Sequence, residues 1–186
     1  GNPRDKIQAV LEELDLQSGD VVVDVGAGDG FWSKEMAKQV GDKGMVHALE
    51  VVESKVDKMK KDLADIANLR PYVSPTDTTT LPEDSCDLAF LSKVYHHLED
   101  GGRVEYLRHL KKVVKPNGRL CIIERLPAIS SGRSKSHGWP LGNLIEQAEE
   151  AGWIAVGSDL LRSTYHYIAV FVPRELFPTE AQPKKR

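Results

Sequence analysis

Apolar residues recur along the chain with two different periods, and the two periods alternate. Short continuous runs rich in β-branched residues, such as residues 21–25, indicate strands that are buried on both faces of a parallel sheet. Apolar positions spaced three or four residues apart, as at Ile7, Val10, Leu11 and Leu14, indicate amphipathic helices. Further strands are predicted over residues 45–49, 71–73, 88–91, 120–123, 153–156 and 165–172, and further helices around residues 36–40, 52–66, 104–114 and 141–151.

This alternation predicts the fold class. Strands that alternate with helices form right-handed βαβ crossovers, which gives one doubly wound sheet covered on both faces. The last two strands have no helix between them, and a tight connection of that kind forces them to pair antiparallel. We therefore expect an α/β fold with a seven-stranded sheet, mostly parallel with one antiparallel strand near its edge. A single domain is expected over residues 1–172, followed by a flexible tail over residues 173–186.

Composition and charge narrow the class of protein. The 186 residues are 40% hydrophobic and 28% charged, which excludes collagen-like, disulfide-scaffold and wholly disordered chains. With a net charge of -3, nothing global attracts the protein to nucleic acid or anionic lipid, and neither partner is expected. No apolar run approaches the roughly 20 residues that span a bilayer. Residues 1–6 do not resemble a secretory signal. The two cysteines, Cys86 and Cys121, each lie in an apolar run. We expect reduced core thiols and a cytoplasmic location.

Three glycines, Gly26, Gly28 and Gly30, follow the first predicted strand at the end where open α/β sheets bind ligands. Glycines there permit positive φ angles and let a ligand approach the backbone N–H groups. The dinucleotide pattern G-x-G-x-x-G would place a small residue at position 31, where this chain has Phe31. Asp24 would repel a pyrophosphate but can hold the ammonium group of an amino-acid-like ligand. The loop therefore favours S-adenosylmethionine over NAD.

Further segments follow this loop in order. They are Glu50 at the end of the second strand, Asp77-Thr78-Thr79-Thr80-Leu81-Pro82, Ser92-Lys93-Val94-Tyr95-His96-His97-Leu98, and Lys115-Pro116-Asn117-Gly118-Arg119-Leu120. Together with Asp24-x-Gly26-x-Gly28-x-Gly30 they resemble the class I S-adenosylmethionine-dependent methyltransferases, in the small-molecule, methyltransferase type 11-like branch. The resemblance covers roughly residues 17–172 and implies a Rossmann-like fold. Asn117 and Lys93 depart from the family's pattern.

The resemblance also implies roles for individual residues in holding the cofactor. Glu50 would accept both ribose hydroxyls, Asp77 would receive the adenine amino group, and Val51 would pack against an adenine face. The implied cofactor-binding set is Asp24, Gly26, Ala27, Gly28, Gly30, Glu50, Val51, Asp77, Thr78 and Ser92. Two simpler interpretations stay open, in which Glu50 only ends a strand in solvent and Asp77 only forms a turn.

The turn after the fourth strand holds the candidate catalytic residues Tyr95, His96 and His97. Methyl transfer is an in-line displacement, so the protein has to align the two reactants and, where needed, accept a proton. The resemblance implies that His97 helps to deprotonate the acceptor, although paired histidines can also only fill the start of a helix. Tyr95 either orients a substrate or packs against the sheet. Lys93 either attracts an acidic acceptor or is a solvated surface residue.

No metal site is expected, because contiguous residues such as His96, His97, Glu99 and Asp100 point in diverging directions. The segment over residues 127–140 is either a mobile flap with His137 and Trp139 as substrate contacts, or a plain loop in which Trp139 anchors the next helix. Tyr165, His166 and Tyr167 lie on the last strand, where at least one should be a core or surface residue.

The acceptor is left unidentified by the sequence. A small molecule is favoured because Leu81-Pro82 and His96-His97-Leu98 look most like that branch of the family. The alternatives are a protein acceptor at an open site, and a module that binds the cofactor without catalysis. A homodimer in which a neighbouring subunit completes the pocket is also left open.

Overall fold

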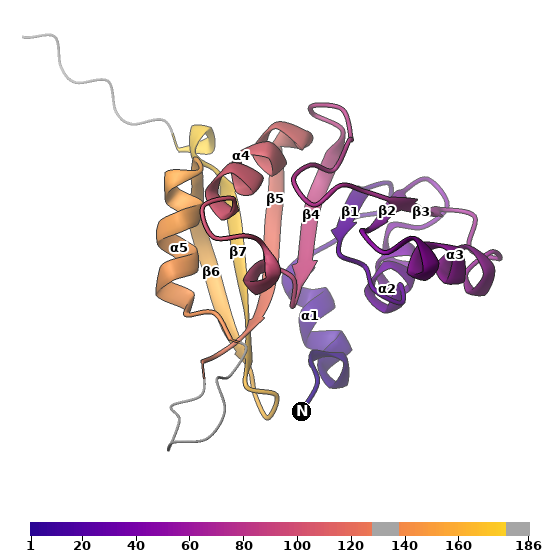
Figure 1. Ribbon diagram of the computed structural model, residues 1–186, viewed down its shortest axis with the longest axis horizontal. Coiled ribbons are helices and arrows are strands. Elements are labelled where there is room, and N and C mark those ends of the chain that lie inside the picture. The colour runs from indigo at the N-terminus through magenta and orange to yellow at the C-terminus, as the bar shows by residue number, and fades with distance from the viewer. Residues whose placement is uncertain (128–137, 178–186) are drawn as a thin grey trace, which may run out of the picture.

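One seven-stranded sheet forms the centre of the structure, with the strand order β3-β2-β1-β4-β5-β7-β6 (Figure 1). The computed structural model describes residues 1–127 and 138–177. Its strands are β1 (Val21–Val25), β2 (Met45–Glu50), β3 (Leu69–Val73), β4 (Cys86–Ser92), β5 (Val114–Arg125), β6 (Trp153–Leu161) and β7 (His166–Pro173). Its helices are α1 (Ile7–Leu14), α2 (Phe31–Val40), α3 (Glu53–Asp62), α4 (Arg103–Val113) and α5 (Leu141–Glu150), with short 3-10 turns η1 (Pro3–Lys6), η2 (Tyr95–His97) and η3 (Arg174–Leu176).

The pairing of the strands confirms the predicted topology. β1 pairs in parallel with β2 and β4, β2 with β3, and β4 with β5. β7 runs antiparallel to both β5 and β6, so it is the reversed strand next to the edge of the sheet. The sheet is therefore mostly parallel with one antiparallel strand, as the missing helix between the last two strands predicts.

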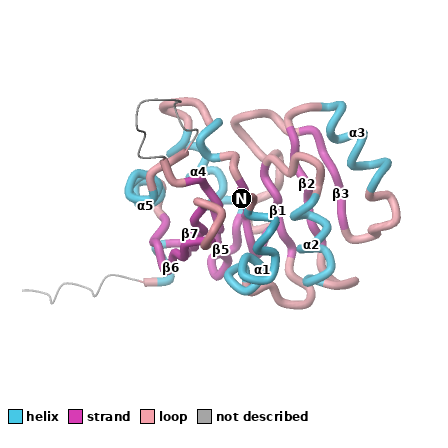
Figure 2. Tube along the Cα trace, turned by 90° about the horizontal axis from the view of Figure 1, so that it is seen from below, coloured by secondary structure: helices cyan, strands magenta, loops and turns pink. Residues whose placement is uncertain are grey.

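Helices cover both faces of the sheet (Figure 2). One face packs against α1, α2 and α3, which bury Val10, Met36 and Met59. The other face packs against α4 and α5, which bury Leu107 and Leu144. The central strands β1 and β4 lie between these two apolar layers, which explains why both are continuous apolar runs rather than alternating ones.

The strand order reverses between β1 and β4, because the chain adds β2 and β3 on one side and then returns to add β4 on the other. Loops after the parallel strands leave a crevice at such a point, and open α/β sheets bind their ligands there. The glycine loop after β1 and the η2 turn after β4 both lie at this crevice. The topology thus brings together the two motifs that the sequence singles out.

Several predicted elements differ in their bounds from those observed. The helix predicted over residues 52–66 ends at Asp62, although Leu63 and Ile66 still pack against the core from the following turns. The strand predicted over residues 153–156 runs on to Leu161 through a polar stretch. β6 is an edge strand, so its backbone pairs with β7 while its side chains stay exposed, and it needs no apolar pattern over that length.

β5 is also longer than predicted. It begins at Val114 rather than at Leu120 and contains the predicted Pro116-Asn117-Gly118 turn. The register with β4 jumps at this turn, since Cys86 pairs with Val114 and Leu88 with Arg119. The turn is therefore a bulge within the strand rather than a boundary before it.

The first residues of the predicted tail, 173–176, belong to regular elements. Pro173 closes β7 and η3 follows over Arg174–Leu176, whereas residues 178–186 lie outside the described part of the chain. Cys86 and Cys121 are free and buried, as predicted, and burial raises the pKa of the Cys121 thiol to about 12. Among the described residues, no helix has the length and apolar character needed to cross a membrane.

Candidate active site

The glycine loop after β1 is shaped by close packing on both sides. Gly26 has φ +70, and a Cβ there would lie 2.4 Å from Cγ2 of Val94. Gly30 has φ +79, and a Cβ there would lie 2.5 Å from Cδ1 of Leu63. At Gly28 a Cβ would meet nothing within 4 Å. Gly26 and Gly30 are thus needed for packing, whereas Gly28 faces open space that a ligand can enter.

A cavity of about 650 Å³ opens beside this loop, at the carboxyl ends of β1, β2 and β4. The predicted cofactor-binding residues that line it are Asp24, Gly26, Ala27, Gly28, Glu50, Val51, Asp77 and Ser92. Gly30 and Thr78 are the two predicted cofactor-binding residues that do not line it. Gly30 packs against the side chain of Leu63, and the hydroxyl of Thr78 lies 3.4 Å from Nε2 of His109.

Asp24 contributes a buried carboxyl group to the cavity. Its side chain accepts a hydrogen bond from the hydroxyl of Ser33 at 2.5 Å, and the residue is 2% exposed. Burial raises the pKa of Asp24 from its ordinary value of 3.8 to about 7. No ion-pair partner for Asp24 exists among the described residues. A buried carboxyl without a cation fits the ammonium group that the sequence predicts beside it.

Glu50 ends β2 inside the cavity and not in solvent, since it is 5% exposed. Its Oε2 accepts a hydrogen bond from the N–H of Gly28 at 3.0 Å, and its Oε1 accepts from the N–H groups of Val51 at 2.9 Å and Val52 at 3.2 Å. A carboxylate has about four acceptor positions. One hydroxyl can therefore bind directly, and a bidentate contact to a ribose would need one N–H bond to be shared or displaced.

Asp77 and Val51 form the outer rim of this cavity. Asp77 is exposed and belongs to the segment that follows β3. This segment is tied to α4, because Nε2 of His109 lies 2.9 Å from the N–H and 2.8 Å from the hydroxyl of Thr79. Val51 is 49% exposed, so its apolar side chain leaves a surface that a flat ring could cover.

Tyr95 is a core residue and does not contact either cavity, which corrects its assignment as a catalytic residue. It is 0% exposed, its hydroxyl donates to Oε1 of Gln147 at 2.6 Å, and its ring packs edge-on against Trp139. Burial also raises the pKa of Tyr95. The interpretation that Tyr95 packs against the sheet is therefore the right one.

His96 is held by an acid that the sequence analysis missed. Its Nδ1 lies 2.9 and 3.0 Å from the two carboxylate oxygens of Glu124, and its backbone N–H donates to the same carboxylate at 3.2 Å. Glu124 is 0% exposed in β5. A glutamate inside an otherwise apolar strand was the available signal, because a buried acid needs a partner. The carboxylate places the ring proton of His96 on Nδ1.

His97 is exposed, and its ring centroid lies 3.9 Å from that of His96. A second cavity of about 560 Å³ begins at these histidines, at the ends of β4 and β5 and the start of β7. Three residues line both cavities: Asn2, Lys93 and His97. Those that line only the second are Gly1, His96, Arg125, Thr164, Tyr165 and His166. The two cavities therefore meet at Asn2, Lys93 and His97.

The remaining candidates divide between core and cavity. Trp139 is half-buried between the ring of Tyr95 and the guanidinium of Arg103, which lies 4.0 Å from its centroid, so it anchors the start of α5. Tyr167 is buried and donates to the carbonyl of Trp139 at 2.9 Å. His137 lies outside the described residues. Within the part of the chain that is described, no three His, Cys, Asp or Glu side chains form a group suited to a metal ion.

The chain matches known proteins in sequence. A family model described as "Methyltransferase domain" matches residues 22–118. The ubiquinone/menaquinone biosynthesis C-methyltransferase UbiE of Hydrogenovibrio crunogenus is 27% identical over 117 residues, which are 61% of this chain and 45% of that protein. The demethylmenaquinone methyltransferase of Listeria welshimeri is 30% identical over 116 residues, which are 61% of this chain and 48% of that protein. The matches thus cover less than half the length of these relatives.

The fold matches solved structures over nearly its whole length. A SAM-dependent methyltransferase from Aquifex aeolicus superposes with a TM-score of 0.79 and 26% sequence identity, over 89% of this chain and 88% of that chain. The likeness confirms the Rossmann-like fold that the sequence predicts.

Proposed function

The chain belongs to the methyltransferase domain family, and on this premise we propose that it transfers the methyl group of S-adenosylmethionine to a small-molecule acceptor. The observation that carries the proposal is the meeting of two cavities at the switch point of the sheet. The first contains the buried carboxyl groups of Asp24 and Glu50, and the second begins at His97. A donor in the first and an acceptor in the second face each other across Lys93 and His97.

S-adenosylmethionine is the cofactor of this family, and when bound it would supply a methyl group on a sulfonium sulfur. A nucleophile would bond to the methyl carbon in line as the carbon–sulfur bond breaks, and S-adenosylhomocysteine would leave. Asp24 binds the ammonium group, Glu50 binds the ribose, and Asp77 binds the adenine amino group at the rim. Acidic side chains outnumber basic ones in this cavity, which favours a ligand with a net positive charge. The acids are Asp24, Glu50, Asp77, Glu99 and Glu105, and the cations are Arg4, Lys55 and Lys93, of which Lys55 lies 3.9 Å from Oε2 of Glu50.

His97 accepts the proton that an acceptor hydroxyl, thiol or ammonium group has to lose. Its place at the junction of the cavities puts it beside both reactants, and a neutral imidazole is suited to proton transfer near neutral pH. His96 acts as a positioning residue, because Glu124 fixes its ring and its ring packs against that of His97.

A small molecule is the favoured acceptor because of the second cavity. Its volume of about 560 Å³ lies within the roughly 300–1,000 Å³ range of small-ligand pockets. The two curated relatives are named for quinone methylation, which supports the same class of acceptor. A protein acceptor is the alternative. A homodimer and a cytoplasmic location stay predictions of the sequence, and light scattering of the purified protein measures the former.

Two measurements test the function. Calorimetry with S-adenosylmethionine and S-adenosylhomocysteine should give saturable binding, and its absence would refute the cofactor site. Product formation should then be measured across quinones, phenols, thiols, amines and peptides. Turnover of a small molecule supports the proposal, turnover of peptides alone favours a protein methyltransferase, and cofactor binding without turnover of any acceptor favours a regulatory module.

A further inference from the structure

The two cavities differ in the balance of their charges. Five carboxylates and three cations, Arg4, Lys55 and Lys93, line the first, whereas no aspartate or glutamate of the described residues lines the second. The second instead has two permanent cations, Lys93 and Arg125, together with His96, His97 and His166. In a chain with 28 acidic and 25 basic side chains, a cavity without any lining acid is a departure from the average surface.

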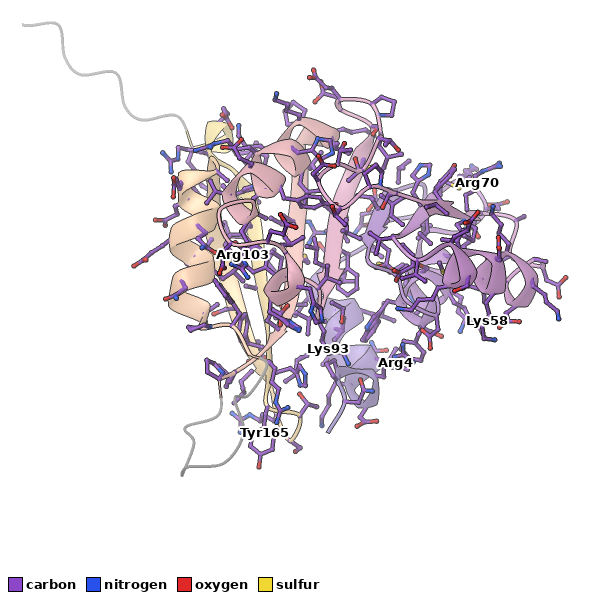
Figure 3. The ribbon with its side chains drawn as sticks, viewed as in Figure 1. Arg4, Lys58, Arg70, Lys93, Arg103 and Tyr165 are labelled. Atoms are coloured by element: carbon purple, nitrogen blue, oxygen red, sulfur yellow. The ribbon has the colours of Figure 1, made fainter. Side chains whose placement is uncertain are left out.

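The strand pairing brings these cations together. Arg125 ends β5 directly opposite His166 in the antiparallel pair of β5 and β7, so their side chains lie on the same face. Lys93 follows β4, and its backbone N–H donates to the carbonyl of Ile123 in β5 at 2.8 Å. Burial lowers the pKa of His166, and the positive charges of Lys93 and Arg125 lower it further, which reflects their proximity. Figure 3 shows Lys93 and Tyr165 at the same end of the sheet.

Within residues 1–127 and 138–177, no acidic side chain is paired with Lys93 or Arg125. Glu124, the nearest acid in sequence to Arg125, is turned to His96 and is 0% exposed. Lys93 also has φ +59, a left-handed conformation that is unfavourable for lysine and is found disproportionately at binding sites.

We propose that the second cavity binds an anionic group of the methyl acceptor, a carboxylate or a phosphate, through Arg125 and Lys93. The inference rests on the proposed function and names the chemical class of its substrate. Arg125 binds the two oxygens of the anion with its planar guanidinium, and Lys93 adds a point charge at the junction with the donor cavity. The anion thereby orients the reacting atom of the acceptor toward His97.

Titration calorimetry of the protein saturated with S-adenosylhomocysteine tests this inference. The probes are 4-hydroxybenzoate, phenyl phosphate and the neutral 4-hydroxybenzamide. We expect at least one acid to bind about tenfold more tightly than the amide, as a charge-assisted hydrogen bond provides. The acid that is preferred identifies the anion as carboxylate or phosphate.

Substitutions test whether the anion binds at Arg125 and Lys93 or responds only to the overall charge of the protein. Arg125→Gln and Lys93→Gln should each weaken binding of the preferred acid about tenfold, whereas Arg125→Lys keeps the charge but loses the two-oxygen contact and should retain only part of the preference. Arg70→Gln is the matched control, because Arg70 is an exposed cation at the far edge of the sheet (Figure 3) and should change nothing. Thermal unfolding of each variant confirms that it is folded.

Several outcomes overturn the inference. They are equal binding of amide and acids, no binding of either acid, and unchanged binding of the acids to the Lys93→Gln, Arg125→Gln double variant. If Lys93→Gln weakens only S-adenosylhomocysteine, then Lys93 serves the cofactor and its part in the proposal is wrong. Loss of S-adenosylhomocysteine binding by the wild type would instead refute the proposed function.

Discussion

The carboxylate of Glu124 holds the imidazole of His96, with Nδ1 of the histidine 2.9 Å from Oε2 of the glutamate. The two residues are 28 positions apart in the chain. They meet because β4 and β5 are parallel neighbours, and the turn after β4 folds back over the end of β5. The pair connects the buried sheet to the junction of the two cavities.

Replacing this acid should affect the histidine and the fold together. Glu124→Leu leaves the Nδ1–H and the backbone N–H of His96 without their acceptor, which should cost about 1–3 kcal/mol in the free energy of unfolding. Urea denaturation measures that loss. Glu124→Gln keeps an acceptor oxygen and is the matched control. If His96 is fixed by Glu124, its NMR signals should show the Nδ1–H tautomer in wild type and a mixture of tautomers in Glu124→Leu.

His97→Gln should lower kcat while leaving the affinity for S-adenosylhomocysteine unchanged. General-base catalysis typically contributes about 10²–10⁴-fold, which sets the expected loss with acceptors that give up a proton. His47→Gln is a control for histidine loss, because His47 lies in β2 and lines neither cavity. Full activity of His97→Gln would show that His97 only fills the turn.

Asp77→Ala should weaken cofactor binding without destabilising the fold. Asp77 is exposed at the rim, so its loss removes one hydrogen bond to the adenine, worth about 1 kcal/mol and roughly five- to tenfold in Kd. Asp65→Ala removes another exposed acid and serves as the control in the same calorimetric titrations. Unchanged affinity of Asp77→Ala contradicts the assignment.

Glu50→Ala should weaken the cofactor and also the protein. The carboxylate accepts hydrogen bonds from the N–H groups of Gly28, Val51 and Val52, so its removal leaves three donors unpaired beside the cavity. We expect a lower midpoint of urea unfolding together with weaker binding of S-adenosylhomocysteine. Glu50→Gln separates the two effects, because it retains an acceptor oxygen for the loop but lacks the charge.

The affinity for S-adenosylmethionine should fall as the pH drops below about 7, the pKa of buried Asp24. The bound ammonium group needs the ionised carboxylate, which is protonated below that pH in the free protein. Asp24→Asn should bind weakly and lose this part of the pH dependence. Calorimetry between pH 5.5 and about 8 checks both expectations, a window set by the roughly two-unit span over which a single group titrates.

The carboxyl group of Asp24 also affects the free energy of unfolding of the free protein, which should fall as the pH rises, whereas the affinity for the cofactor should increase. The pKa of Asp24 is raised by folding, so its contribution to stability is fully present below the unfolded value of 3.8 and is lost as the pH rises through about 7. Asp24→Asn should therefore stabilise the free protein near neutral pH. Urea denaturation without ligand at pH 5 and 8 gives the free energy of unfolding at each pH. If folding raises the pKa of Asp24, the difference between the two values should be smaller for Asp24→Asn than for wild type.

The sequence by itself determined the fold class and the position of the glycine loop after β1. The periods of the apolar residues, the missing helix before the last strand and the glycine spacing at Gly26 to Gly30 are local properties, and local backbone preferences decide them. The sequence determined the ends of the strands less well. The second half of β6 and the bulge at Pro116 depend on pairing with neighbouring strands, which no local pattern contains.

Only the tertiary structure decided the rest of the site. The sequence suggests Tyr95 as a catalytic candidate, whereas in the structure its side chain is buried against Gln147 and Trp139. The side chain of Thr78 faces α4. Glu124 and Arg125 are adjacent in sequence, yet Glu124 contacts His96 and Arg125 lines the second cavity. They differ because successive residues of a strand point to opposite faces. Strand pairing between β4, β5 and β7 places Lys93, Arg125 and His166 at one end of the sheet, and contacts over such sequence distances are fixed by packing rather than by spacing.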